Sequence, residues 1–252
     1  MKALTTALLV SLLAQASVLD ADEVTLIAPG GIRAAVVKLI PDFERKTGHK
    51  VVATFGSGLG TKQQVTRGEP FDVPIVQPPY PELIASGHVL ADTATPLASV
   101  AVGVAVRTGQ PKPDISTADA VKRLLLGVKF ISYPNAASGA AAGVSFNATL
   151  DRLGIADQMK PKIKIAQGGA GAMALLAKGD VDIGLTFISE IITEPGVELV
   201  GPLPREISTP TSLVGFVSAH ARTPEAARAL LAFLSSPDAA SVYRACGMEP
   251  AR

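Results

Sequence analysis

Apolar residues follow two patterns in turn along this chain. Short, nearly continuous apolar runs rich in β-branched residues predict strands over residues 24–28, 50–55, 72–76, 99–106, 130–133, 162–166, 182–187 and 211–218. Apolar residues at helical spacing predict helices over residues 33–46, 59–67, 81–86, 120–126, 139–153, 172–178, 224–234 and 237–244. Strands that alternate with helices are typical of parallel sheets covered by helices, so the predicted fold class is α/β.

Several residues indicate where the predicted helices begin, bend or end. Pro41 predicts a kink or a break in the first helix, because proline removes a helical hydrogen bond. Gly48 predicts a left-handed cap at the end of the same segment. The stretch 116–119 and Thr223 are predicted to cap the helices that follow them.

Four of the predicted helices follow a turn rich in glycine or serine. The turns lie at residues 29–31, 56–58, 137–139 and 168–171. A helix start of this kind leaves backbone N–H groups unpaired, with the positive end of the helix dipole behind them. Two turns fall in each half of the chain, so we expect a cleft in which helix N-termini converge on a small anion.

The order of the segments predicts two α/β lobes. The chain is expected to cross between them near residue 98 and again near residue 210. Lobe I then comprises residues 17–97 and 211–252, and lobe II comprises residues 98–210. Open α/β sheets bind ligands at the carboxyl ends of their strands, so we expect the ligand between the lobes.

The first sixteen residues have the features of a secretory signal peptide. Lys2 supplies a positive charge, residues 3–14 are mostly apolar, and Ala14-Gln15-Ala16 fits the small-x-small cleavage pattern. The apolar part is too short to span a membrane as a helix. Residues 1–16 are therefore predicted to be removed on export, and the mature protein is predicted to be periplasmic.

Composition excludes several classes of function. The 252 residues include 48% hydrophobic and 18% charged residues, a globular profile, and no tryptophan for a sugar-stacking platform. The net charge is +1 without a basic run, which argues against nucleic-acid binding. Cys246 is the single cysteine and the three histidines share no short spacing, so neither a disulfide nor a metal site is expected. Nucleotide-binding loops and the serine-hydrolase elbow are also missing, and no cofactor is expected.

Five motifs in order carry a resemblance to a known family. They are Ala-Pro-Gly-Gly (28–31), Phe-Gly-Ser-Gly (55–58), Gly-Glu-Pro-Phe-Asp-Val (68–73), Gly-Leu-Thr-Phe-Ile-Ser-Glu (184–190) and Pro-Glu-Ala-Ala (224–227). On these the chain resembles the type II periplasmic binding proteins, and within them the molybdate-binding family. The resemblance covers nearly all of the mature chain. It implies two lobes with parallel-rich sheets, a monomer, and an inner-membrane ABC permease as partner.

The chain departs from the family pattern at two of its oxyanion ligands. The resemblance implies an oxyanion held by serine hydroxyls, backbone N–H groups and a tyrosine hydroxyl. Ser57 matches the second-turn serine, but Gly31 replaces the first-turn serine and Phe187 replaces the tyrosine. Each lost hydrogen bond to a charged group costs roughly 1.5–3 kcal/mol, which argues against tight molybdate binding. Arg33 offers a fork suited to a carboxylate, so an organic anion is favoured.

The candidate ligand-binding residues come from both lobes. They are Gly30, Gly31, Arg33, Ser57 and Gly58 in lobe I, and Tyr133, Ser138, Gly139, Gly169, Ala170, Phe187 and Ser189 in lobe II. If the protein is an enzyme, Glu190 is the first choice of general base. Its place at a helix start is expected to lower its pKa.

Two main functions remain open from the sequence, and a third, weaker alternative is a sensor domain that passes its ligand state to a membrane partner. In the first, an exported receptor closes its lobes over a small anion and delivers it to the permease. In the second, the protein is an isomerase. The resemblance allows this alternative, because the relatives that it implies include an exported aconitate isomerase. Such an enzyme moves a double bond in an unsaturated tricarboxylate and needs one acid/base group beside the anion cradle.

Overall fold

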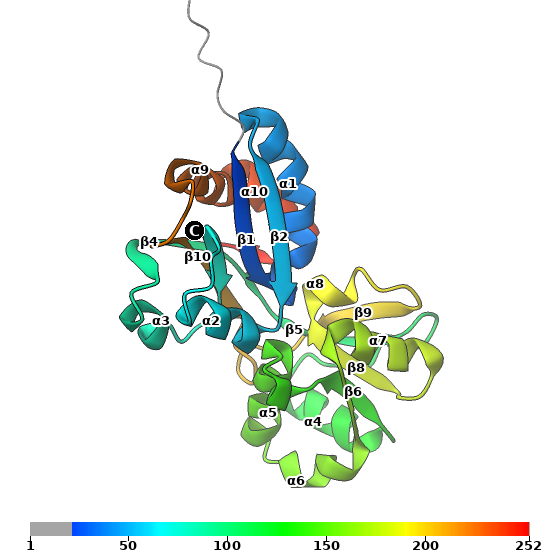
Figure 1. Cartoon of the computed structure of the whole chain (residues 1–252). Coiled ribbons are helices and arrows are strands. Elements are labelled where there is room, and N and C mark those ends of the chain that lie inside the picture. The colour runs from blue at the N-terminus through cyan, green and yellow to red at the C-terminus, as the bar shows by residue number, and fades with distance from the viewer. Residues whose placement is uncertain (1–21, 252) are drawn as a thin grey trace, which may run out of the picture.

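The computed structural model describes residues 22–251, which form two lobes, each built on one mixed β-sheet (Figure 1). The predicted signal peptide lies outside these residues. Strands and helices alternate along most of the chain, so the predicted α/β class is confirmed. Each sheet combines parallel and antiparallel pairs, so the sheets are mixed and not purely parallel.

The first lobe contains a six-stranded sheet in the order β11-β4-β10-β3-β1-β2. β1 lies parallel to β2 and β3, whereas β10 is antiparallel to β3 and β4. The strands are β1 (Glu23–Pro29), β2 (Lys50–Gly56), β3 (Val73–Val76), β4 (Val89–Val100), β10 (Thr211–Ser218) and β11 (Glu249–Pro250). The helices are η1 (Gly30–Ile32), α1 (Arg33–Thr47), α2 (Gly58–Thr66), α3 (Pro81–Ala85), α9 (Pro224–Leu234) and α10 (Pro237–Ala245).

The second lobe contains a five-stranded sheet in the order β7-β6-β8-β5-β9. β6 lies parallel to β7 and β8, whereas β5 is antiparallel to β8 and β9. The strands are β5 (Val102–Arg107), β6 (Ile131–Pro134), β7 (Ile163–Ala166), β8 (Ile183–Phe187) and β9 (Val197–Pro202). The helices are α4 (Ala118–Gly127), η2 (Ala136–Ser138), α5 (Ala141–Arg152), α6 (Ala156–Met159), η3 (Lys160–Lys162), α7 (Gly168–Lys178) and α8 (Ile188–Ile191).

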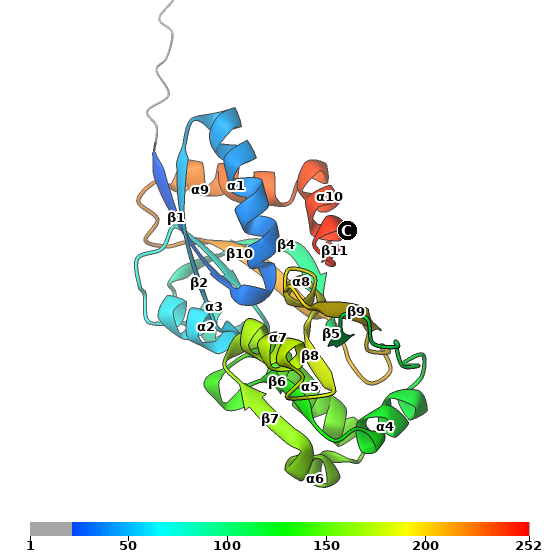
Figure 2. The same ribbon diagram turned by 90° about the vertical axis from the view of Figure 1, so that its right-hand side faces the viewer.

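The central strands of the first sheet are buried on both faces. Leu26 of β1 belongs to the core that includes Phe43 of α1, whereas its neighbour Ile27 packs in a second cluster with Val65 of α2 and Leu83 of α3. Successive strand residues point to opposite faces, so this division places α1 and α2 on opposite sides (Figure 2). Burial on both faces explains why β1 and β3 are apolar without alternation, whereas the edge strand β2 alternates between exposed and partly buried residues.

The strand predicted over 99–106 is wrong as a single element. β4 ends at Val100 in the first sheet, Ala101 follows, and β5 begins at Val102 in the second sheet. Both parts are buried, so the apolar run continues through the change of sheet and hides it. The chain returns to the first sheet between β9 and β10.

Three helix details differ from the sequence pattern. α1 continues through Pro41 without a break. Gly168 to Gly171 form the first turn of α7, not a separate turn before it. Thr223 makes no side-chain cap on α9. The predicted cap at Gly48 is confirmed by its φ of 80°.

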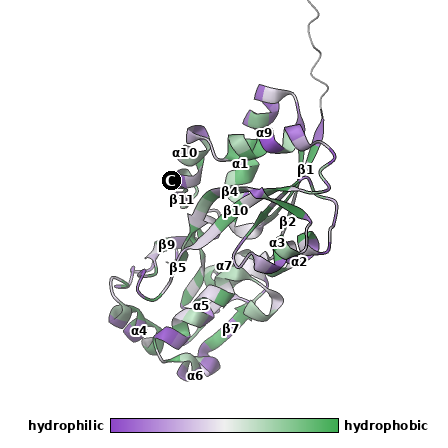
Figure 3. Cartoon of the chain, turned by 90° about the vertical axis from the view of Figure 1, so that its left-hand side faces the viewer, coloured by the Kyte–Doolittle hydropathy of each residue, from purple (hydrophilic) through white to green (hydrophobic). Residues whose placement is uncertain are grey.

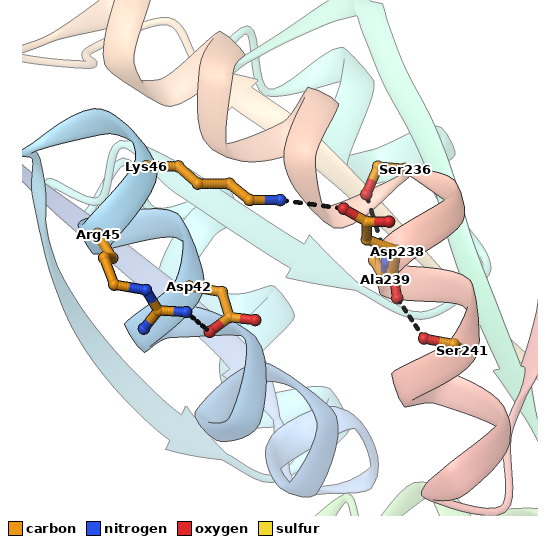
Figure 4. A network of polar contacts seen from close by, with 7 residues as sticks. All are labelled: Asp42, Arg45, Lys46, Ser236, Asp238, Ala239 and Ser241. Carbon is orange, nitrogen blue, oxygen red and sulfur yellow. Dashed lines mark hydrogen bonds and ion pairs between the residues drawn. The ribbon is translucent and has the colours of Figure 1, made fainter.

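The C-terminal helices pack on α1. Lys46 of α1 pairs with Asp238 of α10 at 3.0 Å, and Ser236 caps α10 (Figure 4). The pair is exposed and contributes under about 1 kcal/mol. The packing of Phe43 against Phe233, with ring centroids 5.6 Å apart, therefore matters more for the position of these helices.

Hydrophobic residues concentrate on the strands and the inward sides of the helices, whereas α6 at the far end of the second lobe is largely polar (Figure 3). Among residues 22–251, no helix combines the length and the apolar character that crossing a bilayer requires.

Asp72 joins three segments of the first lobe. Its side chain is 1% exposed and accepts hydrogen bonds from the backbone N–H and the hydroxyl of Thr25, at 2.7 and 2.6 Å, and from the backbone N–H of Arg222 at 2.6 Å. Burial opposes ionisation, but these hydrogen bonds outweigh it and hold the pKa of Asp72 below its usual range. The carboxylate therefore stabilises the lobe as a charged group.

We expect Asp72→Ala to lower the free energy of unfolding by about 3 kcal/mol, because it leaves several buried donors without a partner. A depressed pKa adds stability above the unfolded value, and that stability is lost as the pH falls below about 4. The variant should therefore lose less stability in acid than the native protein, measured by urea unfolding at pH 7 and pH 3.5. The exposed Asp92→Ala is the control, with a change within about 0.5 kcal/mol. A loss for Asp72→Ala no larger than that of the control would contradict this role.

Candidate functional site

The carboxyl ends of the parallel strands of both sheets meet at one cavity. The cavity has a volume of about 430 Å³ and lies between the lobes. Lobe I contributes Pro29 and Gly56, which end β1 and β2, and Gln77, which follows β3. Lobe II contributes the corresponding residues of β6, β7 and β8, which are Pro134, Gln167 and Phe187. The parallel part of each sheet thus directs one edge at the same space.

Helix N-termini line the cavity from both lobes. α2, α5 and α7 begin at its wall, and η1 leads into α1 there. Ser57 caps α2 by accepting the N–H of Gly60 at 3.1 Å, but the residues before α5 and α7 make no side-chain cap. The first-turn N–H groups of α5 and α7 therefore create a positive potential that suits an anion.

Arg33 adds a full positive charge at the start of α1. Its guanidinium carbon lies 5.4 Å from the centre of the Phe55 ring, and both residues line the cavity. Arg33 forms no salt bridge within the part of the chain that the structure describes. Its planar fork is therefore available to a carboxylate.

Glu190 places a carboxyl group in this electropositive surrounding. Its Oε2 accepts a hydrogen bond from the Thr186 hydroxyl at 2.5 Å. A Cβ on Gly169 would overlap Glu190 Oε2, and a Cβ on Gly30 would lie 3.3 Å from Oε1. The carboxyl thus lies between the first turns of η1 and α7, and the absence of a side chain at Gly169 leaves it room.

The pKa of Glu190 is raised, which corrects the expectation of a lowered pKa. Burial is the largest cause and the charge of Glu194 adds to it, whereas hydrogen bonds from Thr186 and the Phe187 backbone act in the opposite direction. The helix that carries Glu190 spans only Ile188–Ile191, so its dipole is too small to offset burial.

Gly31 and Phe187 are complementary. A Cβ on Gly31 would lie only 2.8 Å from Cδ2 of Phe187, so the phenyl ring fills the space that a serine would need there. Ser189 fixes this contact, because its hydroxyl donates to the Gly31 carbonyl oxygen at 2.7 Å. The two departures from the family pattern therefore form one apolar wall.

Nine of the predicted site residues come together at the cavity, and four do not. Those that line it are Gly30, Gly31, Arg33, Ser57, Gly58, Ser138, Gly169, Phe187 and Glu190. Those that do not are Tyr133, Gly139, Ala170 and Ser189.

Local contacts explain these four exceptions. The buried Tyr133 donates its hydroxyl proton to Asn147 Oδ1 at 2.8 Å. Gly139 packs against Leu59 across the lobe interface, and its carbonyl oxygen accepts the Leu59 N–H at 3.1 Å. Ala170 is exposed beside a neighbouring groove, and Ser189 is engaged with Gly31.

Gln77 and Gln167 line the cavity but were not among the predicted site residues. Gln77 and Gln167 each directly follow a predicted strand. A search for residues at the carboxyl ends of strands would therefore have identified them, whereas a search for glycine turns did not. Within residues 22–251, no group of three or more histidine, cysteine or acidic side chains is placed to hold a metal ion.

A family model described as bacterial extracellular solute-binding protein matches residues 24–249. The chain belongs to this family.

Two curated relatives of this chain have different functions. An aconitate isomerase from Pseudomonas sp is 32% identical over 248 residues, which cover 95% of this chain and 93% of that protein. The molybdate-binding protein ModA of Escherichia coli is 23% identical over 233 residues, which cover 90% and 89%. The resemblance to the molybdate-binding family is therefore confirmed.

Solved structures confirm the fold. The Azotobacter vinelandii periplasmic molybdate-binding protein superimposes with a TM-score of 0.76 at 20% identity, over 91% of this chain and all of that one. The substrate-binding domain of a molybdenum ABC transporter from Clostridium difficile gives 0.72 at 19% identity, over 92% of this chain and all of that one. The chain thus has the two-lobed fold of these binding proteins, and its relatives act on different ligands.

We expect Glu190→Gln to stabilise the ligand-free protein above about pH 4.3, because it removes a carboxylate whose ionisation burial disfavours. For an acid with a raised pKa, stability is lost as the pH rises from the unfolded value through the folded one. The gain over the native protein should thus grow as the pH rises above about 4.3 in urea unfolding. Glu225→Gln, an exposed acidic residue on α9 outside the cavity, serves as the control, and a gain for Glu190→Gln that does not change with pH would refute the raised pKa.

Proposed function

We propose that the protein binds a small organic polycarboxylate between its lobes and interconverts the cis and trans isomers of an unsaturated tricarboxylate such as aconitate. The position of Glu190 carries this proposal. It is a carboxyl group of raised pKa inside a cradle of helix N-termini. The 32% identity to an aconitate isomerase supports the same conclusion.

The cavity suits carboxylates better than a tetrahedral oxyanion. Arg33 matches the geometry of a carboxylate, and the first turns of α5 and α7 can bind further carboxylate oxygens. Phe187 and Gly31 offer no hydroxyl for an oxyanion, and the Glu190 carboxyl adds repulsion toward a small dianion that contacts it. A larger polycarboxylate can instead keep its charged groups on the helix termini and its carbon chain toward Glu190.

The proposed reaction is a proton shift along three carbons. Glu190, as a carboxylate, removes a proton from the methylene carbon next to the double bond, and the electron pair enters the conjugated system as a dienolate. Helix N–H groups and Arg33 stabilise the charge that develops on the carboxylate oxygens. Glu190 then returns the proton to the former alkene carbon, so the double bond moves and its geometry can change. A raised pKa suits both steps, because the group must take and release a proton near neutral pH.

A receptor role is the second candidate, and the family match favours it. Periplasmic relatives of this fold are solute-binding proteins, one of them a domain of an ABC transporter. The same cavity would then deliver its carboxylate to an inner-membrane permease. In both roles we expect an exported, periplasmic monomer that carries no cofactor.

We expect the mature protein to convert trans-aconitate to cis-aconitate, followed by proton NMR. Glu190→Gln should lower turnover by about 10²–10⁴-fold, the usual contribution of a general base. Its affinity for tricarballylate, a saturated tricarboxylate, should stay within about threefold of the native value, because Gln keeps the hydrogen bond from Thr186. The native rate should also fall as the pH drops through the raised pKa of Glu190.

Glu225→Gln, on the exposed surface of α9 and outside the cavity, is the control and should keep its turnover, since it leaves the Glu190 carboxyl and its surroundings in place. Binding of trans-aconitate without turnover by the native protein would contradict the isomerase and support the receptor. Full turnover in Glu190→Gln would assign the proton transfer to another group.

A further inference from the structure

Gln77 is the buried polar side chain of the cavity that has no assigned role. It is 5% exposed and follows the end of β3, beside the ends of β1 and β2. Its Nε2 has no hydrogen-bond partner among the described residues. A buried N–H group without a partner is costly, and such groups are rare in folded proteins unless a ligand or water completes them.

The surroundings fix the orientation of this side chain. A Cβ on Gly58 would overlap Gln77 Oε1, so the amide occupies the space that this glycine leaves free. Ala141, in the first turn of α5 on the other lobe, lies against the same point, since the same Cβ would be 3.2 Å from its methyl carbon. The Gln77 carboxamide therefore lies beside Gly58 at the boundary between the lobes, where an anion would sit as the lobes close.

Gln77 and Glu190 lie at different ends of the cavity. Glu190, Arg33 and Gly169 also line a groove of about 500 Å³ between α1 and α7. Gln77, Gly58 and Ala141 instead line a second pocket of about 360 Å³. The main cavity shares Glu190, Arg33 and Gly169 with the groove, and it shares Gln77, Gly58 and Ala141 with the second pocket. It therefore extends from a Glu190 end to a Gln77 end.

The Gln77 end carries positive charge. Lys62 of α2 lines the second pocket with Gln77, and its Nζ donates to the Pro79 carbonyl oxygen at 2.9 Å. The N-termini of α2 and α5 point at the same region. An amide donor backed by a cation and two helix starts matches a carboxylate.

We propose that Gln77 determines specificity by donating its amide N–H to the substrate carboxylate at the end of the cavity opposite Glu190. This inference rests on the proposed function, because it takes the ligand to be a polycarboxylate. A tricarboxylate can fill both ends, whereas a dicarboxylate that lacks the carboxylate held by Gln77 cannot. Gln77 thereby selects tricarboxylates.

The test compares Gln77→Leu with the native protein by calorimetric titration of three saturated probes. Tricarballylate has three carboxylates, glutarate lacks the central one, and methylsuccinate lacks a terminal one. We expect the variant to bind tricarballylate about 10- to 100-fold more weakly, the range for a hydrogen bond to a charged group. At least one of the two dicarboxylates should bind as before. Equal losses for all three probes, or tricarballylate binding within twofold of native, would overturn the proposal.

Two controls separate recognition from folding. Thr61→Val removes another buried, partnerless polar group, from α2 but away from the cavity, and should leave all three affinities unchanged. Without ligand, Gln77→Leu should melt at or above the native temperature, because it removes an unsatisfied group at similar volume. A lower melting temperature together with equal losses for all probes would assign Gln77 a structural role.

The same measurements distinguish this proposal from the isomerase. A native protein that binds tricarballylate but does not convert trans-aconitate would refute the proton shift and leave the Gln77 proposal standing. A native protein that binds none of the three probes would refute both.

Discussion

The structure depends on one constraint, which is that the N–H groups in the first turn of a helix have no partner within that helix. In each lobe the parallel strands end at the same edge, and the helices that follow start there. α5 and α7 begin without side-chain caps, and η1 leads into α1 in the same way. These N–H groups remain available only because they face a cavity between the lobes. The candidate anion site is therefore a consequence of the topology, and a bound anion would satisfy groups that the fold leaves open.

What distinguishes this cavity is the set of side chains placed within that positive potential. Glu190 is a carboxyl in a site for anions, held by Thr186 and given room by the glycines of two helix starts. The Phe187 ring fills the space beside Gly31, so neither position presents a hydroxyl group to the cavity. Burial disfavours the charged form of Glu190, while the helix termini can hold the charges of a ligand. The combination suits proton transfer to and from a bound polycarboxylate better than the capture of a fully dehydrated oxyanion.

Much of the fold was predictable, since long apolar runs and helical periodicity fix most elements within a few residues. The change of sheet at Ala101 was not, because both strands are buried and share one apolar run. In the candidate site, the glycine turns pointed to Gly30, Ser57 and Gly169, which line the cavity. The sign of the Glu190 pKa shift was wrong, because burial depends on how the lobes pack and on the brevity of α8. Tyr133 was expected at the ligand, but the strand turns its hydroxyl toward Asn147, a pairing that a sequence does not display.

The central claim is that the cavity recognises a carboxylate ligand and not molybdate. The most direct measurement is the thermal shift of the mature native protein with molybdate and with trans-aconitate, each titrated to saturation. A ligand at 100 times its dissociation constant adds about 2.7 kcal/mol, which raises the melting temperature by several degrees. We predict such a shift with trans-aconitate and none with molybdate at the same concentration. Stabilisation by molybdate alone would contradict the account, because it would show that the helix termini hold an oxyanion without the hydroxyls that Gly31 and Phe187 lack.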